Sequence, residues 1–175
     1  MELLFEINDQ KLGMNNPEID HYKIKKSARA VLFNDQNQVA IMYVSKDNYH
    51  KLPGGSFEKE DNNELNIALK REILEETGFV ISTINQEVGM ILEFRNDKNW
   101  EALYINYCMI AKTAGQQSIQ QFTDFEKEHG FELKWMDLNQ AISTISNENP
   151  DDYNGKFIVA RDIVFLKKAK EILNI

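Results

Sequence analysis

Apolar and polar positions along the chain change their period several times, and each change predicts an element. The runs 28–33 and 39–44 are apolar and partly β-branched, and the polar segment 34–37 lies between them. Two such runs around an Asn/Asp turn predict a β-hairpin. Further runs typical of strands cover 79–84, 87–95, 101–112 and 131–136.

Helical spacing is present in three segments. Apolar residues recur every three to four positions over 64–77, 138–146 and 156–173. Gly78 follows the first segment, and glycine commonly ends a helix. The polar segments 114–130 and 147–155 are expected to be loops. Strands and helices therefore alternate irregularly, which predicts an α/β (α+β) fold with a mixed sheet and helices packed on it.

The first 21 residues are expected to form an N-terminal arm. They contain one short apolar run, 3–7, which is long enough for one extra strand, and then a polar stretch with Gly13 and Pro17. From Tyr22 onward the strand pattern begins. A chain of 175 residues suits a single domain, which we place at 22–175.

Charge and composition exclude several classes of protein. The chain has 20 basic and 28 acidic residues, a net charge of -8, whereas binding to a nucleic-acid backbone needs a basic surplus. The single cysteine, Cys108, can form neither an intrachain disulfide nor a cysteine zinc cluster, which suits a cytoplasmic location. Every apolar run is shorter than the roughly 20 residues of a membrane helix, and the acidic start does not resemble a signal peptide.

The segment 64–77 has an unusual distribution of charge. On a helix, Leu65, Leu69, Glu72 and Glu76 form one stripe, with Glu75 at its margin. The first two turns of this stripe are apolar and the last two are acidic, whereas amphipathic helices usually place charge on the opposite face. Carboxylates that converge at the edge of a core repel one another unless a cation lies among them.

Taken alone, this segment is better interpreted as a solvated surface helix, because charge runs are usually solvated. Arg71 and Glu75 would then form an ordinary (i, i+4) pair. The residues around the segment change this interpretation. The sequence Leu-Pro-Gly-Gly at 52–55 predicts a sharp bend, because proline lacks an N–H donor and glycine adopts angles that other residues avoid.

Together these residues resemble the Nudix box, the signature G-x5-E-x7-R-E-U-x-E-E-x-G-U of the Nudix hydrolases, where U is a bulky apolar residue. Gly55 matches its first position, and the second half matches without a gap at Arg71, Glu72, Ile73, Glu75, Glu76, Gly78 and Phe79. The resemblance covers roughly residues 22–172. It implies a Nudix α/β/α sandwich with a mixed β-sheet.

The chain departs from the family pattern at one point. Arg71 lies sixteen positions after Gly55 instead of fourteen, and Asp61 stands six positions after Gly55 where the family has glutamate. The simplest alignment keeps Asp61 in the early acidic role and inserts two residues near 62–63. Alternatives for this role are Glu58, Glu60 and Glu64.

The resemblance implies a function and a metal site. Members hydrolyse a nucleoside diphosphate linked to another moiety, here a nucleotide small molecule, with Mg²⁺ as the cofactor and Mn²⁺ as an alternative. Magnesium prefers carboxylate and carbonyl oxygens. By resemblance, Arg71 orients a carboxylate of the helix, and Glu72 is a ligand or the general base. The metal ligands implied are Glu72, Glu75, Glu76, Gly55 and Asp61.

A general base is often drawn from a loop in this family. The corresponding loop here is 124–130, where Glu128 and Glu126 are the candidates. A merely solvated loop is about equally consistent with its polar composition.

Recognition of the substrate has weaker signals. Arg29 and Arg95 are cations within predicted strands and are assigned either to a phosphate or to an edge-strand salt bridge. Four aromatic residues are candidates for stacking on a base, although core packing is the more common role: Tyr43, Phe94, Trp100 and Tyr104. The absence of a proline in 91–96, where ADP-ribose-specific members often have one, favours a nucleoside triphosphate or a small nucleotide conjugate.

Two other functions are compatible with the sequence. A Nudix domain can bind a nucleotide as a non-catalytic sensor, although the intact Arg71, Glu72, Glu75 and Glu76 favour catalysis. The acidic helix could also belong to an interaction module. A homodimer is left open by the sequence.

Overall fold

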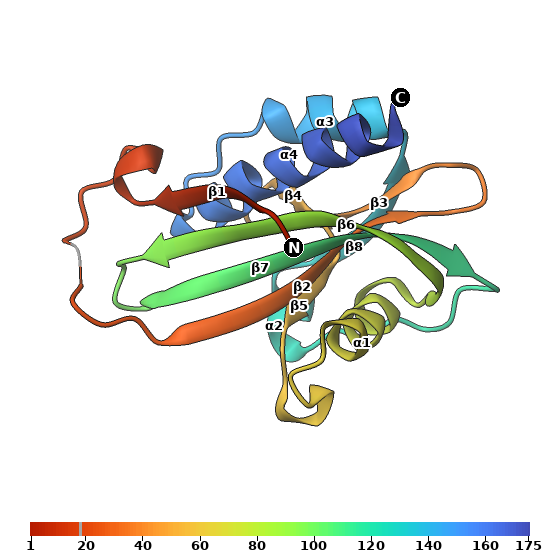
Figure 1. The fold of residues 1–175 in the computed structure, drawn as a ribbon, viewed down its shortest axis with the longest axis horizontal. Coiled ribbons are helices and arrows are strands. Elements are labelled where there is room, and N and C mark those ends of the chain that lie inside the picture. Colours follow the sequence, from red (N-terminus) through yellow and green to blue (C-terminus); the bar gives the residue numbers. More distant parts are fainter. Residues whose placement is uncertain (18) are drawn as a thin grey trace.

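The computed structural model describes residues 1–17 and 19–175, which form three layers. A mixed sheet lies between helix α1 (Leu65–Thr77) on one face and helices α3 (Leu138–Ser146) and α4 (Tyr153–Leu173) on the other (Figure 1). This arrangement confirms the α/β/α sandwich with a mixed sheet.

Eight strands of the described residues make up the sheet, with the order β1-β6-β7-β2-β3-β4, while β5 pairs with β2 and β8 with β3. The pairs β1·β6 and β2·β7 are parallel and the others antiparallel. The strands are β1 (Leu3–Asn8), β2 (Ile24–Phe33), β3 (Val39–Val44), β4 (Tyr49–Lys51), β5 (Gly54–Ser56), β6 (Val80–Arg95), β7 (Ala102–Ala114) and β8 (Phe131–Met136).

Strands β2 and β3 form the predicted hairpin and then diverge. They meet at Phe33 and Val39. Farther along, β2 pairs with β5 at Ser27, Ala28 and Arg29, while β3 pairs with β4 and β8. Leu52 and Pro53 connect β4 to β5, and the two glycines of the Gly-Gly bend begin β5. The divergence therefore places the bend in the sheet beside β2 and next to α1.

The two strands predicted at 79–84 and 87–95 are one strand, β6, of 16 residues. Its register against β7 shifts between Ile81 and Thr83, between Ile84 and Gln86, and between Glu87 and Gly89. Such β-bulges bend a strand without ending its pairing. The polar residues near 85–87 interrupt the apolar pattern, but β7 still pairs with this part of the strand.

Two further boundaries differ from the predictions. The expected loop 114–130 contains helix α2 (Asp124–Glu128). A capping box between Thr123 and Glu126 forms the N-terminus of this helix. Helix α4 begins at Tyr153 instead of 156, because the Asp152 side chain accepts a hydrogen bond from the Gly155 N–H at 2.5 Å. Two short 3-10 helices are also present, η1 (Gln10–Leu12) and η2 (Lys59–Asp61).

The sheet carries a hydrophobic core on each face. Under α3 and α4 lies the larger core, which includes Val31, Ile41 and Phe157. Under α1 lies the smaller core, in which Leu69 and Ile73 of the helix pack against Ala28, Ala30 and Leu32 of β2. Burial of these side chains holds α1 at a fixed position on the sheet.

The end of α1 is the one predicted from Gly78, which adopts the left-handed conformation with φ of 74° and donates to the Leu74 carbonyl. Among the described residues, no helix combines the length and the apolar character needed to cross a membrane.

Candidate active site

The Gly-Gly bend between β4 and β5 brings the backbone into close contact with α1. Gly54 has φ of +123°, and a Cβ there would lie 2.1 Å from the Ala28 carbonyl oxygen. The Gly54 N–H donates to Oε2 of Glu76 at 2.7 Å. At Gly55 a Cβ would lie 2.3 Å from Oε2 of Glu72. Gly54 therefore needs glycine, whereas a side chain at Gly55 would displace the Glu72 carboxylate.

The three carboxylates of the box lie on the last two turns of α1. Glu72 and Glu76 are buried, and Glu75 is partly exposed. Glu72 and Glu75 both accept hydrogen bonds from Nη1 of Arg71, at 2.9 and 3.0 Å. Burial and the neighbouring charge of Glu76 raise the pKa of Glu72 to about 7. Burial is the larger of these two causes, and the like charge of Glu76 adds to it.

Glu76 has a cationic partner that the sequence patterns did not single out. Lys51, at the end of β4, places its ammonium group 2.6 Å from Oε1 of Glu76, and both side chains are buried. The same ammonium group lies 4.7 Å from the centre of the Phe131 ring. The position of Lys51 just before the bend was the only available signal for this contact.

Arg71 links the helix to the loop before it. Its Nε and Nη2 donate to the two carboxylate oxygens of Asp61 at 3.1 and 2.8 Å, and Nη2 also donates to the Ser56 carbonyl. Asp61 in turn accepts from the Glu58 N–H at 2.7 Å. The hydrogen bond from Arg71 holds the pKa of Asp61 below its usual range.

Both oxygens of Asp61 are thus bound within the protein and anchor Arg71, and the role of Asp61 as a metal ligand stays a prediction. The two inserted residues, Asn62 and Asn63, each adopt a left-handed conformation, with φ of 51° and 61°. Asparagine tolerates this conformation better than most residues. The insertion is thus accommodated in the turn between η2 and α1. Of the alternatives for the early acidic role, Glu58 lines the cavity described below.

The end of α1 is covered by the segment 117–121. The Gln121 N–H donates to the Glu75 carbonyl at 2.8 Å and the Ser118 N–H to the Gly78 carbonyl at 2.7 Å. The side-chain amides of Gln117 and Gln120 donate to the carbonyls of Thr77 and Glu76. The last carbonyls of a helix lack partners within the helix, so this segment satisfies them and holds the turn that carries Glu75 and Glu76.

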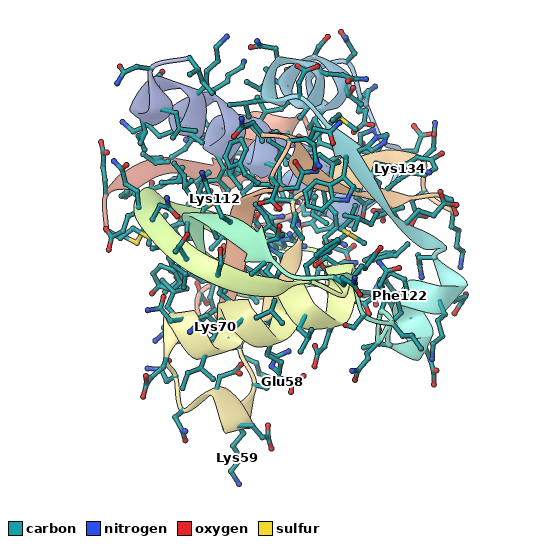
Figure 2. The ribbon with its side chains drawn as sticks, turned by 90° about the vertical axis from the view of Figure 1, so that its right-hand side faces the viewer. Glu58, Lys59, Lys70, Lys112, Phe122 and Lys134 are labelled. Atoms are coloured by element: carbon teal, nitrogen blue, oxygen red, sulfur yellow. The ribbon has the colours of Figure 1, made fainter. Side chains whose placement is uncertain are left out.

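A cavity of about 340 Å³ lies between α1, the bend and the sheet. Its acidic lining consists of Glu58, Glu72, Glu75, Glu76 and Glu126. Its basic lining consists of Lys25, Arg29, Lys51, Arg71, Arg95 and Arg161. Its aromatic lining consists of Tyr49, Trp100, Tyr104, Phe125 and Phe131. Figure 2 shows α1 with the η2 turn of Glu58 and Lys59 below it and the α2 segment after Phe122 to one side.

The two loop candidates for a general base, Glu126 and Glu128, differ in their position relative to the cavity. Glu126 lines the cavity, and its Oε2 accepts from the Thr123 N–H and hydroxyl at 2.7 and 2.9 Å. Glu128 is exposed and pairs with Lys46 at 2.6 Å, which lowers the pKa of Glu128. Glu128 is not among the residues that line the cavity.

The aromatic candidates for substrate recognition also differ in whether they line the cavity. Trp100 and Tyr104 line the cavity, whereas Tyr43 packs against His50 and Phe94 against Tyr22. Arg95 is buried and bound by Glu93 at 2.6 and 2.9 Å, with its guanidinium 4.4 Å from the centre of the Tyr104 ring. Arg95 therefore forms the salt bridge within the sheet that was one of its two expected roles.

Comparison with known proteins identifies the family. A NUDIX domain model matches residues 23–157, and the chain therefore belongs to the Nudix domain family. An ADPR-responsive transcriptional repressor, NtrR, of Acinetobacter baylyi is 27% identical over 118 residues. The match covers 65% of this chain and 44% of the repressor, so this chain spans less than half the length of that curated relative.

Solved structures share the fold. The Nudix domain of Shewanella oneidensis NrtR, determined with ADP-ribose, is 18% identical with a TM-score of 0.58, covering 94% of this chain and 97% of that chain. The ORF135 protein of E. coli is 14% identical with a TM-score of 0.59, covering 90% and 96%. At these identities the likeness supports the α/β/α sandwich fold alone. The substrate has to be inferred from the residues of the site.

Proposed function

We propose that the protein is a Mg²⁺-dependent hydrolase that cleaves the diphosphate linkage of a nucleoside diphosphate joined to another moiety. The observation that carries this proposal is the placement of Glu72, Glu75 and Glu76 along one wall of a cavity that also presents cationic and aromatic side chains. Carboxylates suit a divalent cation, cations suit phosphate, and aromatic rings suit a base.

The donor set fits a divalent cation. Within residues 1–17 and 19–175, no group of three or more His, Cys, Asp or Glu side chains is gathered closely enough to hold a metal ion as it stands. Oxygens of Glu72, Glu75 and Glu76 accept hydrogen bonds from Arg71, Lys51 and the Gly54 N–H. Burial, the main cause, and the neighbouring charge of Glu76 raise the pKa of Glu72 to about 7, and a cation beside these two carboxylates would relieve the repulsion between them. Because Gly55 has no Cβ, the Glu72 carboxylate can lie directly against the backbone of Gly55.

Mg²⁺, with Mn²⁺ as an alternative, would be held by Glu72, Glu75 and Glu76 with the carbonyl oxygen of Gly55. When bound, such an ion neutralises charge on the diphosphate and orients the bridge. In the proposed reaction water attacks one phosphorus atom and the bridging P–O bond breaks. The water proton passes to a general base.

The side chains of this chain have separate roles in the proposal. Arg71 holds Glu72 and Glu75 in place through the contacts to Nη1. Glu126, the loop carboxylate that lines the cavity, or Glu72 accepts the proton, in preference to Glu128, which is exposed and paired with Lys46. Trp100 and Tyr104 stack on the base.

A second candidate is a sensor that binds a nucleotide without hydrolysing it. One observation in this structure favours it, because the Lys51 ammonium already occupies an oxygen of Glu76. The similarity to an ADPR-responsive repressor points the same way. Binding without turnover is the property that separates this candidate from an enzyme.

The test is a panel of nucleoside triphosphates and nucleoside diphosphate conjugates, ADP-ribose included, incubated with Mg²⁺ or with EDTA, with the products resolved by ion-exchange chromatography. Hydrolysis of one class that EDTA abolishes supports the proposal. Tight binding of one compound without turnover supports the sensor.

Two variants sharpen this test. Glu76→Gln is expected to lower turnover at least 100-fold, whereas Glu171→Gln, at an exposed carboxylate near the end of α4, stays within twofold of the wild type. A Glu76→Gln rate within a few-fold of the wild type would contradict the metal assignment.

A further inference from the structure

Four buried side-chain polar atoms in the described residues have no hydrogen-bond partner, and all four are N–H donors. They are Nε and Nη1 of Arg29, Nη2 of Arg161 and Nδ2 of Asn106. All three residues line the same cavity. Buried polar groups are normally paired, and unpaired ones need an explanation. A cluster that consists of donors alone indicates a ligand rich in acceptors.

Arg29 is held at a defined position of the sheet. It lies on β2 opposite Gly54 of the bend on one side and Cys108 of β7 on the other. Burial and the nearby charge of Arg161 lower the pKa of Arg29, while Asp162, Glu76 and Glu72 act in the opposite direction. An arginine stays protonated in proteins, so Arg29 brings a positive charge close to the α1 carboxylates.

Arg161 is fixed by its other nitrogens. Its Nε donates to Asp162 at 2.7 Å, and its Nη1 donates to Glu93 at 3.2 Å and to Asn106 Oδ1 at 3.1 Å. The Ser27 hydroxyl also donates to this Oδ1 at 2.5 Å. The oxygen of the Asn106 amide is therefore committed, and its Nδ2 remains as a donor. The unpaired donors of Arg161 and Asn106 belong to rigid side chains.

We propose that Arg29, Arg161 and Asn106 form an anion subsite that binds phosphate oxygens of a nucleoside diphosphate. This inference rests on the proposed function, whose substrate it would hold. A water molecule both donates and accepts, whereas a phosphate group offers only acceptors and matches the planar fork of a guanidinium. The subsite and the α1 carboxylates line one cavity, so a diphosphate held at the subsite would lie in the same cavity as the carboxylates.

The subsite also accounts for a difference between the two strand arginines. Arg95 has carboxylate and amide partners from Glu93 and Asn154. Arg29 keeps two nitrogens unpaired at the same cavity. Arg29 is therefore the one of the two that is available to a phosphate.

The test measures anion binding without metal or turnover. ADP and inorganic pyrophosphate are titrated by calorimetry in EDTA into the wild type, Arg29→Met, and the control Lys112→Met, which removes one positive charge from an exposed site on β7. The wild type and Lys112→Met are expected to bind both probes within twofold of each other. Arg29→Met is expected to bind both at least tenfold more weakly.

A stability measurement shows whether Arg29→Met is folded. Because this substitution removes a buried donor without a partner, its melting temperature is expected to equal or exceed that of the wild type. ADP is expected to raise the melting temperature of the wild type and not that of Arg29→Met. Arg29→Lys keeps the positive charge but loses the planar guanidinium. Its affinity for ADP is expected to lie between those of the wild type and Arg29→Met.

Equal affinity of the wild type and Arg29→Met for both probes would overturn the subsite. So would a wild type that binds neither probe in EDTA, even if Mg²⁺-dependent hydrolysis is found. Loss of binding in Arg29→Met together with a wild type that hydrolyses no compound would support the subsite and contradict the proposed hydrolase.

Discussion

The ammonium group of Lys51 lies 2.6 Å from Oε1 of Glu76, and the Gly54 N–H donates to the other oxygen of the same carboxylate. The most buried of the three α1 carboxylates is thus paired with the chain's own cation. A divalent ion bound to Glu76, as proposed, would compete with Lys51 for Oε1. Such competition would link the stability of the metal-free protein to its affinity for metal.

Lys51→Met removes the ammonium group and keeps an apolar stem in its place. Breaking a buried ion pair leaves a charge uncompensated, so the metal-free variant is expected to lose about 3 kcal/mol of unfolding free energy. Mg²⁺ would then stabilise the variant more than the wild type. Urea unfolding in EDTA and in Mg²⁺ measures both effects. The control is Lys70→Met, at an exposed lysine on α1 (Figure 2), and it should behave as the wild type. If Mg²⁺ stabilises Lys51→Met and the wild type by the same amount, the competition is contradicted.

Gly55→Ala places a methyl group 2.3 Å from Oε2 of Glu72. The carboxylate must move, so Mg²⁺ affinity and turnover are expected to fall at least tenfold, while the free energy of unfolding changes by only about 1 kcal/mol. Gly115→Ala is the control, because its Cβ meets nothing within 4 Å and its φ of +73° affects only the backbone. Calorimetric titration with Mg²⁺ decides the outcome, and unchanged affinity in Gly55→Ala would remove Glu72 from the metal site.

Glu126→Gln and Glu128→Gln form a matched pair within one short helix. Glutamine keeps the capping box with Thr123, so α2 is expected to persist. If Glu126 is the base, its variant loses about 100-fold in turnover, a typical contribution of general-base catalysis, and Glu128→Gln stays within twofold. The reverse result would restore Glu128 to the role predicted from the sequence and would require α2 to move.

Asp61→Asn tests the anchor of Arg71 through pH. The pKa of Asp61 lies below its ordinary value of 3.8 in the folded state, so this carboxylate stabilises the fold above about pH 4. Its contribution is lost as the pH falls through the folded pKa. The variant is expected to be about 2 kcal/mol less stable at neutral pH and to lose less stability on acidification. Urea unfolding from pH 2.5 to 7 gives both curves, and parallel curves would exclude the anchor role.

Much of the fold follows from local patterns. The hairpin of β2 and β3, the helix α1 with its end at Gly78, and the helices α3 and α4 each follow from residues close together in the chain. Helix α2 and the continuous strand β6 were missed. A capping box of four residues is a weak signal in a polar segment, and the pairing of β6 with β7 crosses bulges that break the alternation.

The sequence by itself determined the Nudix box, because its spacing is set by one helix and one glycine bend. Only the tertiary structure decided the partners of these residues. Lys51 reaches Glu76 across 25 positions, and Gln117 and Gln120 cap α1 from beyond β7. Arg29 and Arg161 line one cavity from β2 and α4. Contacts between distant segments depend on how the sheet and helices pack, and no local pattern encodes them.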